Sequence, residues 1–332
     1  MWQSQGNALA AQCTLDGESG DHCRLSTKLL TDFRRVEWMW IVLVCATYML
    51  SNYIRAIRWK DLLRTVDVEV STFNAVAATM VGYFANVGVP RLGEILRPGI
   101  LARYDKAPLD RTFGTIVLER IVDVVLFGVM IGLGFLFHYE ALWSYLSSNV
   151  EIQPSTLITI LVLMMVSGVI GILSLRWLLG RREEQLSPFL TKVKGILQGF
   201  IDGILSITRL PNLPLFVAQS IGIWVLYFLM HYLAFLSYEP TASLGLLDAI
   251  LVFDFGALGI VLPSPGGMGT YHFLIVESLD ILKVPRADGF SFAMIIFFTL
   301  NLGCNVVFGL ISLVLLPIVN GKTTSSSTLS TD

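Results

Sequence analysis

This chain of 332 residues has few charged side chains and few residues of the kinds that hold metals or disulfides. Only 14% of its residues are Asp, Glu, Lys or Arg, whereas a soluble domain carries about 25%. Its four cysteines and four histidines form no CxxC pair, no HExxH motif and no other metal-ligand spacing. The net charge is −2 and no basic tract occurs, which argues against a nucleic-acid partner. We therefore predict no metal, no cofactor and no nucleic acid.

The motifs of soluble enzymes are also missing. The sequence has no P-loop, no GxSxG and no long polar region that would form a soluble catalytic domain. His272, just after a glycine run, is the one candidate general base, and a lone His in an apolar segment is more often a hydrogen-bonded interior residue. We expect a protein that is not an enzyme. A membrane enzyme acting on lipid headgroups, with His272 or a carboxylate as base, is the alternative.

Apolar residues are what the sequence has in abundance. They make up 54% of the chain, and the mean hydropathy is +0.69. Five apolar runs approach or exceed the ~20 residues that cross hydrocarbon, and they cover 38–57, 112–137, 154–178, 213–236 and 289–317. We predict an all-α, multi-pass integral membrane protein. Its predicted parts are a polar, poorly ordered N-terminal segment at 1–37, one transmembrane domain at 38–318 and a disordered Ser/Thr-rich tail at 319–332.

Two more apolar segments, 72–104 and 244–284, are interrupted near the middle by Pro and Gly. The first reads Asn86-Val-Gly-Val-Pro-Arg-Leu-Gly-Glu-Ile-Leu-Arg97, and the second reads Leu262-Pro-Ser-Pro-Gly-Gly-Met-Gly-Thr-Tyr-His272. Unpaired peptide groups cost several kcal/mol in hydrocarbon, so such breaks survive only inside protein or beside a water-filled cavity. We predict two re-entrant hairpins. The alternative is that one half of each segment spans the membrane and the other half lies at its surface.

Lys and Arg residues predict the orientation. Arg55, Arg58, Lys60 and Arg64 follow the first span, and 105–111 and 179–212 are also basic, whereas 138–153 has no Lys or Arg. Residues 58–71, 105–111 and 179–212 should be cytoplasmic, and 138–153 should lie outside. Both ends of the first hairpin are then cytoplasmic, and the second hairpin enters from outside, as in transporters with inverted repeats. Lys283 and Arg286 argue against entry of the second hairpin from outside, because these two basic residues would then lie outside.

The basic region at 179–212 also contains a helical pattern. Apolar residues from Phe189 to Leu205 recur at spacings of 3, 4 and 7, and Lys192, Lys194 and Asp202 fall between them. We predict an amphipathic helix in the inner membrane interface. A cytoplasmic helix that caps the bundle fits the same pattern.

Three charged residues lie together in the apolar run 112–137. Glu119 and Asp123 share a helix face at i,i+4, and Arg120 reaches Asp123 at i,i+3. A charge near the bilayer centre costs roughly 2.5–3.5 kcal/mol, so such residues face an interior or a cavity. One interpretation is an internally neutralised structural cluster. The other is an acidic face that pairs with Arg91 or Arg97 and forms the wall of a polar cavity.

The first break combines arginines with a helix start. The planar fork of Arg91 or Arg97 binds two phosphate oxygens at once, and a half-helix beginning after Pro90 adds backbone N–H donors. The second break offers glycines without a charge, although tight packing is the commoner role of glycine in membrane helices. Asp254, alone in an apolar run, needs a partner. The predicted substrate-binding residues are Asn86, Arg91, Glu94, Arg97, Glu119, Arg120, Asp123, Asp254, Gly266, Gly267, Gly269 and His272.

Four motifs in consistent order resemble one known family. They are Arg55-Ala-Ile-Arg-Trp59, Pro90-Arg-Leu-Gly-Glu-Ile-Leu-Arg97, Glu119-Arg-Ile-Val-Asp123 and Pro265-Gly-Gly-Met-Gly269. Over about residues 36–318 the chain resembles the flippase-like lysylphosphatidylglycerol synthase transmembrane-region family. The resemblance implies a domain related to the lipid-translocating half of those synthases. It does not imply aminoacyl transfer, because no soluble transferase domain is found.

The chain departs from the family pattern in two places. Family members usually begin with another transmembrane helix, where this chain has the polar segment 1–37. Many also carry an acid shortly after the glycine run, where this chain has His272. The role of that acid is therefore not transferred to His272.

We predict a protein of the inner (plasma) membrane that binds or moves an anionic phospholipid or lipid-linked precursor through a cavity between the two breaks. Arg91 and Arg97 would hold the phosphate. Glu94, Glu119 and Asp123 would balance charge or carry protons, and the glycines would let the headgroup approach the backbone. The rivals are the headgroup-modifying enzyme and a non-transporting partner of a cell-envelope synthase. The sequence identifies no protein partner.

Overall fold

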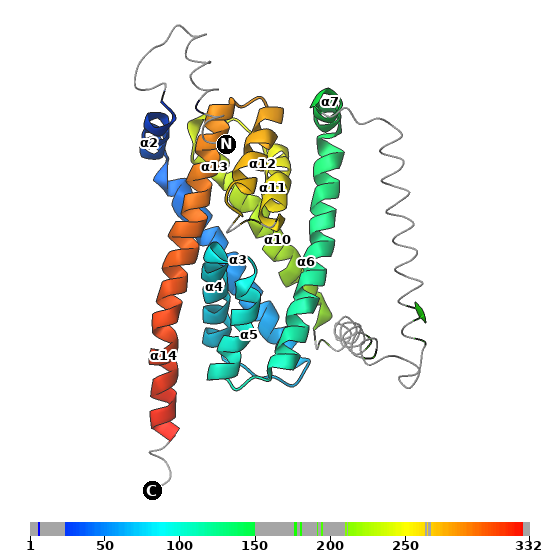
Figure 1. The fold of residues 1–332 in the computed structure, drawn as a ribbon, viewed down its shortest axis with the longest axis vertical. Helices are drawn as coiled ribbons and strands as arrows, with labels where there is room; N and C mark the ends of the chain where they lie inside the picture. Colours follow the sequence, from blue (N-terminus) through cyan, green and yellow to red (C-terminus); the bar gives the residue numbers. More distant parts are fainter. Residues whose placement is uncertain are drawn as a thin grey trace.

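A computed structural model describes residues 6, 24–149, 176–177, 180, 191, 194, 210, 212–262, 264 and 267–327. These residues form helices and no strands, which confirms the predicted all-α class. Most of the long helices run along one axis of the molecule (Figure 1). This is the arrangement expected of a membrane bundle, in which helices satisfy their backbone hydrogen bonds internally.

Three of the described helices are long and apolar enough to cross a membrane. They are α3 (Trp38–Arg64), α10 (Leu213–Leu236) and the continuous helix Arg286–Gly321. Helix α6 (Leu109–Phe137) makes a fourth together with the first residues of α7 (Tyr139–Asn149), to which it is bent by 86°. Four of the five predicted spans are therefore found. The fifth, 154–178, and the predicted amphipathic helix lie almost wholly outside the described residues.

The last span changes helix type on the way. It starts as α13 (Arg286–Phe297), continues as a π-helical segment (Phe298–Val306) and ends as α14 (Val307–Ser327). π-Helical turns are rare and occur mostly at functional sites. The predicted boundary at 318, between the transmembrane domain and the disordered tail, is wrong because it falls inside α14.

The first broken segment is an antiparallel pair of helices. Helix α4 (Thr72–Gly88) and helix α5 (Leu92–Tyr104) lie against each other in the lower half of Figure 1. Val89 is extended and Arg91 is left-handed, with φ of 63°, so the chain reverses within three residues. Asn86 Oδ1 accepts a hydrogen bond from the Gly93 N–H at 2.7 Å. The side chain of Asn86 thus pairs an amide that the start of α5 would otherwise leave free.

The second broken segment has the same form in the upper half of the molecule (Figure 1). Helices α11 (Leu246–Val261) and α12 (Thr270–Ile281) pack against each other there. Gly267 and Gly269 have φ of 77° and 89°, values that glycine adopts without steric cost. Thr270 Oγ1 donates to the Gly259 carbonyl at 2.7 Å. The tips of the two hairpins therefore point toward each other from opposite ends of the bundle (Figure 1), which is the inverted placement that the predicted re-entrant hairpins require.

An N-terminal helix corrects another prediction. Helix α2 (Leu25–Arg35) lies within the segment predicted to be poorly ordered. Lys28 Nζ lies 2.6 Å from Asp288 Oδ1 and 2.9 Å from Asp32 Oδ2, which connects α2 to α13. Burial lowers the pKa of the Lys28 amine, but its bonds to Asp288 and Asp32 outweigh burial and raise that pKa. The prediction for 1–37 is therefore wrong for these residues, which have both apolar and ionic anchors.

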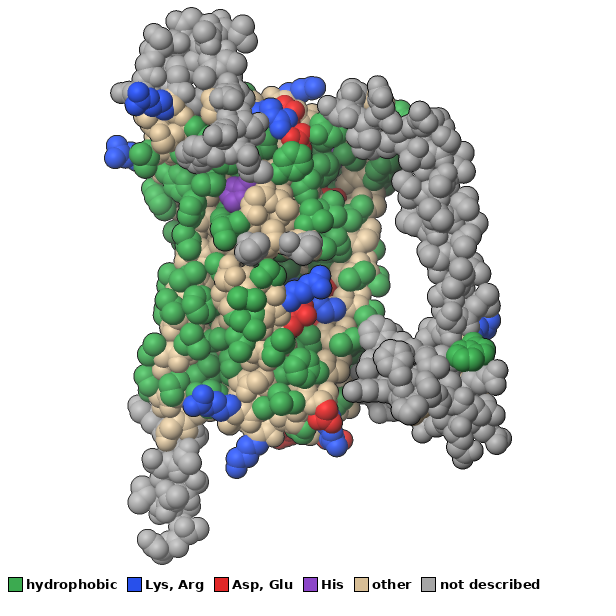
Figure 2. All heavy atoms as spheres, viewed as in Figure 1, with side chains coloured by type: hydrophobic (Ala, Val, Ile, Leu, Met, Phe, Trp, Pro, Cys, Tyr) green, Lys and Arg blue, Asp and Glu red, His purple; other side chains and the backbone are tan. Residues whose placement is uncertain are grey.

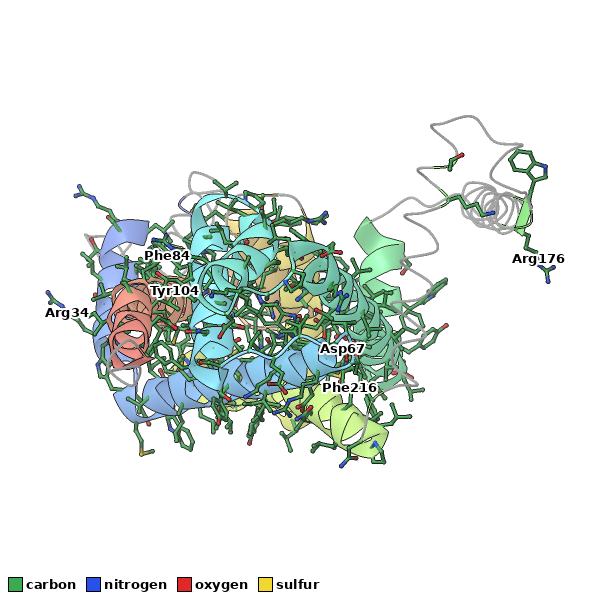
Figure 3. All side chains as sticks on the ribbon, turned by 90° about the horizontal axis from the view of Figure 1, so that it is seen from below. Arg34, Asp67, Phe84, Tyr104, Arg176 and Phe216 are labelled. Carbon is green, nitrogen blue, oxygen red and sulfur yellow. The ribbon has the colours of Figure 1, made fainter. Side chains whose placement is uncertain are left out.

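The apolar core is divided between the two halves of the bundle. The larger cluster joins α3 and α10 to the second hairpin and α13, and a second cluster lies under the first hairpin. In the view from below (Figure 3), Phe84 and Tyr104 lie on the side of α14, whereas Asp67 and Phe216 lie on the opposite side. Gly309 of α14 packs on Phe84 so closely that any side chain at 309 would overlap it. The first hairpin is thus held between α14 and the α3–α6 side of the bundle.

Candidate functional site

Three helices bring five buried, charged side chains into one network. Arg55 and Arg58 come from α3, Arg97 from α5, and Glu119 and Asp123 from α6, and each is at most 8% exposed. Glu119 Oε2 lies 3.1 Å from Arg97 Nη1, and Glu119 Oε1 lies 3.3 Å from Arg58 Nη2. Asp123 Oδ2 lies 2.7 Å from Arg55 Nη1, and its Oδ1 lies 3.1 Å from Arg58 Nη2. We call this group the ion network.

The ion network follows from helix spacing. Glu119 and Asp123 are four residues apart, so both side chains leave the same face of α6. That acidic face meets the basic face of α3, and the reversal after Gly88 brings Arg97 of α5 to the same place. A buried charge that loses its partner costs about 3–5 kcal/mol. The network therefore fixes how the first hairpin sits on the bundle.

The ion network carries more positive than negative charge. At its edge, Arg120 Nη2 lies 3.6 Å from Asp123 Oδ2, and Arg120 Nε lies 3.8 Å from Glu94 Oε1. With these two residues included, four arginines face three carboxylates, which leaves one positive charge without a counter-charge. The Nε and Nη2 atoms of Arg97 have no hydrogen-bond partner among the described residues. The network can therefore accept an anion both electrostatically and by direct donation.

Aromatic and hydroxyl side chains hold the arginines in place. The guanidinium of Arg97 lies 4.2 Å from the centre of the Trp59 ring, within the range of a cation–π interaction. Trp59 Nε1 in turn donates to Thr115 Oγ1 at 3.0 Å. Arg58 Nη1 donates to Ser220 Oγ of α10 at 3.0 Å. The Arg97 side chain is thus held in one position, and its unpaired Nε and Nη2 donors are held with it.

A polar face of α3 extends from the ion network toward the π-helical segment. Tyr48, Asn52 and Arg55 follow one another at helical spacing and are all buried. Tyr48 donates to Asn305 Oδ1 of the π-helical segment at 2.7 Å. Asn52 is fully buried, and neither polar atom of its side chain has a hydrogen-bond partner in the described chain. From Tyr48 to Arg58 this face covers about 15 Å, roughly half of a hydrocarbon core.

The ion network reaches the surface beside the tip of the first hairpin. Arg91 is exposed, and the side chains of Glu94 and Arg120 are 39% and 42% exposed. Figure 2 shows a small group of charged side chains at mid-height in a face that is otherwise largely apolar. Arg120 lies eleven residues into α6, about 17 Å from its lower end. Charges at such depth normally face a cavity or a polar ligand.

The structure separates the two predicted partners of the acidic face. Arg97 pairs with Glu119, whereas Arg91 forms no ion pair within the described part of the chain. The predicted contact between Arg120 and Asp123 is present. Asn86, predicted as a substrate ligand, uses its side-chain oxygen to close the hairpin tip. The acidic face is therefore neither isolated nor merely self-neutralised, because α3 and α5 supply most of its counter-charges.

The predicted residues of the second hairpin stay apart from the ion network. Asp254 is 5% exposed, and the partner that the sequence led us to expect is not found among the described residues. His272 lies between Phe290 and Phe297, with its ring centre 4.6 Å from that of Phe297, and its Nε2 has no partner there. Gly267 and Gly269 shape the tip, and Gly266 lies outside the described residues. The described chain holds no group of three His, Cys, Asp or Glu residues suited to a metal ion.

Two residues of the ion network were missing from the predicted site. Arg55 and Arg58 were interpreted as orientation signals and as part of a family motif, but not as site residues, yet α3 continues to Arg64 and buries both. The predicted cytoplasmic side of 58–71 stays a prediction, although residues 58–64 belong to α3. The signal that would have found Arg55 and Arg58 is the spacing of Tyr48, Asn52 and Arg55, which places these polar side chains on one face of an apolar helix.

Comparison with known proteins identifies the family of this chain. The family model described as the lysylphosphatidylglycerol synthase TM region matches residues 26–316. The chain belongs to this family. A UPF0104 membrane protein of Methanocaldococcus jannaschii is 20% identical over 271 residues, which cover 74% of this chain and 76% of the relative. Another UPF0104 membrane protein, of Methanothermobacter thermautotrophicus, is 20% identical over 261 residues, covering 73% and 75%. No solved structure matches the chain.

Proposed function

We propose that this protein binds an anionic lipid or lipid-linked precursor in the inner (plasma) membrane and moves its headgroup between the leaflets. The observation that carries the proposal is the group of exposed Arg91 and partly exposed Glu94 and Arg120 near the middle of the bundle, continuous with the ion network. Membrane-facing charges are costly unless they meet water or a polar ligand. A lipid that enters sideways would bring its phosphate to this group while its acyl chains stay in the bilayer.

The charge balance favours a negatively charged headgroup. The arginines of the network and its edge outnumber the carboxylates by one, and Arg91 adds a further positive charge beside them. The two free donors of Arg97 match phosphate oxygens, which guanidinium groups bind with two parallel hydrogen bonds. In this proposal Arg91 meets the phosphate first and Arg97 holds it inside.

The polar face of α3 supplies a path for the headgroup. Asn52 offers an amide with no partner in the described chain, about one turn from Arg55, and Tyr48 and Asn305 follow toward the second hairpin. The acyl chains would stay outside this face, against the apolar surface of the bundle. The proposal includes no catalytic step, since His272 is packed against aromatic rings and has no acid as a hydrogen-bond partner among the described residues.

The experiment uses purified protein in vesicles that contain an acyl-labelled fluorescent phosphatidylglycerol. Movement between leaflets is measured as label that becomes accessible to an impermeant quencher. Arg91→Ala should slow the movement and weaken lipid binding about tenfold or more, because a hydrogen bond to a charged group is worth ~1.5–3 kcal/mol. Arg103→Ala is the matched control, since Arg103 is also an exposed arginine of α5 but lies in its last turn. Equal effects of the two substitutions, or no movement by the wild-type protein, would refute the proposal.

A further inference from the structure

Asp254 is a buried carboxyl group without a partner in the part of the chain that the structure describes. It lies in the middle of α11, is 5% exposed, and forms no hydrogen bond or ion pair there. Transferring an unpaired carboxylate out of water costs so much that such a group takes up a proton instead. In the packed arrangement of α11, burial without a partner therefore favours the neutral, protonated form of Asp254. The two carboxylates of the ion network and Glu94 at its edge differ, because each has an arginine within 4 Å.

A glycine of α6 makes room for this carboxyl group. Asp254 Oδ2 lies against Gly134, where any side chain would overlap it. Gly128 and Gly132 of the same helix have open space around them, so the notch at Gly134 is specific to Asp254. The carboxyl group thus fills the contact between α11 and α6, and a negative charge there would have little solvent to stabilise it.

The neighbouring ionisable groups do not neutralise Asp254. On the elements packed against α11 they include Asp123 of α6, His138 just after α6, His231 of α10 and Tyr271 of α12, and Asp248 lies on α11 itself. His138 lies 3.2 Å from Asp248, Asp123 pairs with arginines, and His231 Nδ1 lies 2.9 Å from the Tyr227 carbonyl. Tyr271 lies on the side of Gly256 and Gly259. None of these groups bonds to Asp254.

The position of Asp254 connects it to the outer side of the membrane. It lies eight residues from Leu246, the first residue of α11, which is about 12 Å of helix. That end of α11 lies beside the start of α7, at the end of the bundle that the Lys/Arg distribution places outside. A small separation of the second hairpin from α6 would let outer water reach the carboxyl group.

We propose that Asp254 is a proton-binding site that controls the contact between the second hairpin and α6. With a proton bound, α11 packs against Gly134. When the proton leaves to the outer water, the carboxylate stays hydrated and the hairpin separates from α6. Because the site belongs to the protein that we propose moves lipid, this inference rests in part on the proposed function and adds a dependence on outer pH.

The site itself is tested without any lipid movement. Purified wild-type protein at neutral pH should show the infrared carbonyl band of a protonated carboxylic acid, and Asp254→Asn should lack it. Gly134→Ala should lose the band although Asp254 is present, because its side chain displaces the carboxyl group, whereas Gly132→Ala should keep it. Absence of the band from wild-type protein, or its persistence in Asp254→Asn, would overturn the inference.

Hydrogen exchange and lipid movement then test whether Asp254 controls the contact between the second hairpin and α6. The amides of α11 should lose protection as pH rises in the wild-type protein, after correction for intrinsic exchange, and should not in Asp254→Asn. In the vesicle assay, the wild-type rate should change with outer pH by up to about tenfold per unit, and the rate of Asp254→Asn should stay constant. A wild-type protein with the band and the exchange response but no lipid movement would refute the proposed function and leave the proton site standing. Identical exchange profiles for the wild-type protein and Asp254→Asn would refute the claim that Asp254 controls the contact between the second hairpin and α6.

Discussion

Glu119→Gln tests whether the ion network holds the first hairpin in place. The carboxylate of Glu119 is completely buried and lies within 4 Å of three arginines, with distances of 3.1 Å to Arg97, 3.3 Å to Arg58 and 3.7 Å to Arg55. Glutamine keeps the shape and removes the charge, so four arginines would face two carboxylates. Losing one partner of a buried ion pair costs about 3–5 kcal/mol. We expect a loss of that size in the free energy of unfolding.

The assay is equilibrium unfolding in a nonionic detergent free of anionic lipid. Glu69→Gln serves as the control, because Glu69 is exposed in the loop between α3 and α4, and it should change stability by less than ~0.5 kcal/mol. Adding Arg97→Gln to Glu119→Gln restores the original excess of one positive charge, so the double variant should recover about 1–3 kcal/mol. The reasoning fails if Glu119→Gln is as stable as Glu69→Gln, or if the two losses simply add.

Two more predictions concern the hairpins. Gly93→Ala should destabilise the protein by about 1–3 kcal/mol, because the new methyl group would overlap the backbone of Gly82. Gly99→Ala in the same helix meets no atom within 4 Å and should be neutral or stabilising, so equal unfolding curves for the two variants would contradict this packing. In a background without native cysteines, Lys106→Cys should react with an impermeant thiol reagent only from the cytoplasm and Leu246→Cys only from outside. Labelling of Lys106→Cys from outside would rule out the proposed orientation of the first hairpin.

The sequence predicted the fold through the cost of unpaired backbone groups. Continuous apolar runs marked α3, α6, α10 and the last span, and the Pro/Gly interruptions marked both hairpins. The same reasoning failed for α2, because a polar segment can be ordered by a few ion pairs and buried leucines. Apart from the pair of Lys28 with Asp32, those contacts come from residues more than 200 positions away, and no local pattern records them.

The candidate site was predicted only in part, for a similar reason. The arginines of the first break and the acidic face of α6 stood out because charge is rare in apolar runs. The pairing of Glu119 with Arg58 depends on how α3 crosses α6, which spacing along one helix does not determine. Arg58 lies near the end of an apolar run and looked like a loop residue. Its burial is made possible by Glu119 and Asp123 of the neighbouring α6, which supply its counter-charges.

The two hairpins have the same backbone form but different charge, and this difference suggests a division of labour. Arg97 of the first hairpin is held against Glu119 and Trp59, so its charge is fixed and suited to a phosphate. Asp254 of the second hairpin lies against Gly134 and has no counter-charge among the described residues, so in our proposal its charge changes when it binds or releases a proton. A fixed charge binds an anion whatever the position of the hairpin, whereas a removable charge makes one position depend on pH. In our proposals the first hairpin therefore selects the lipid, and the second determines when the path beside α3 opens to the outer side.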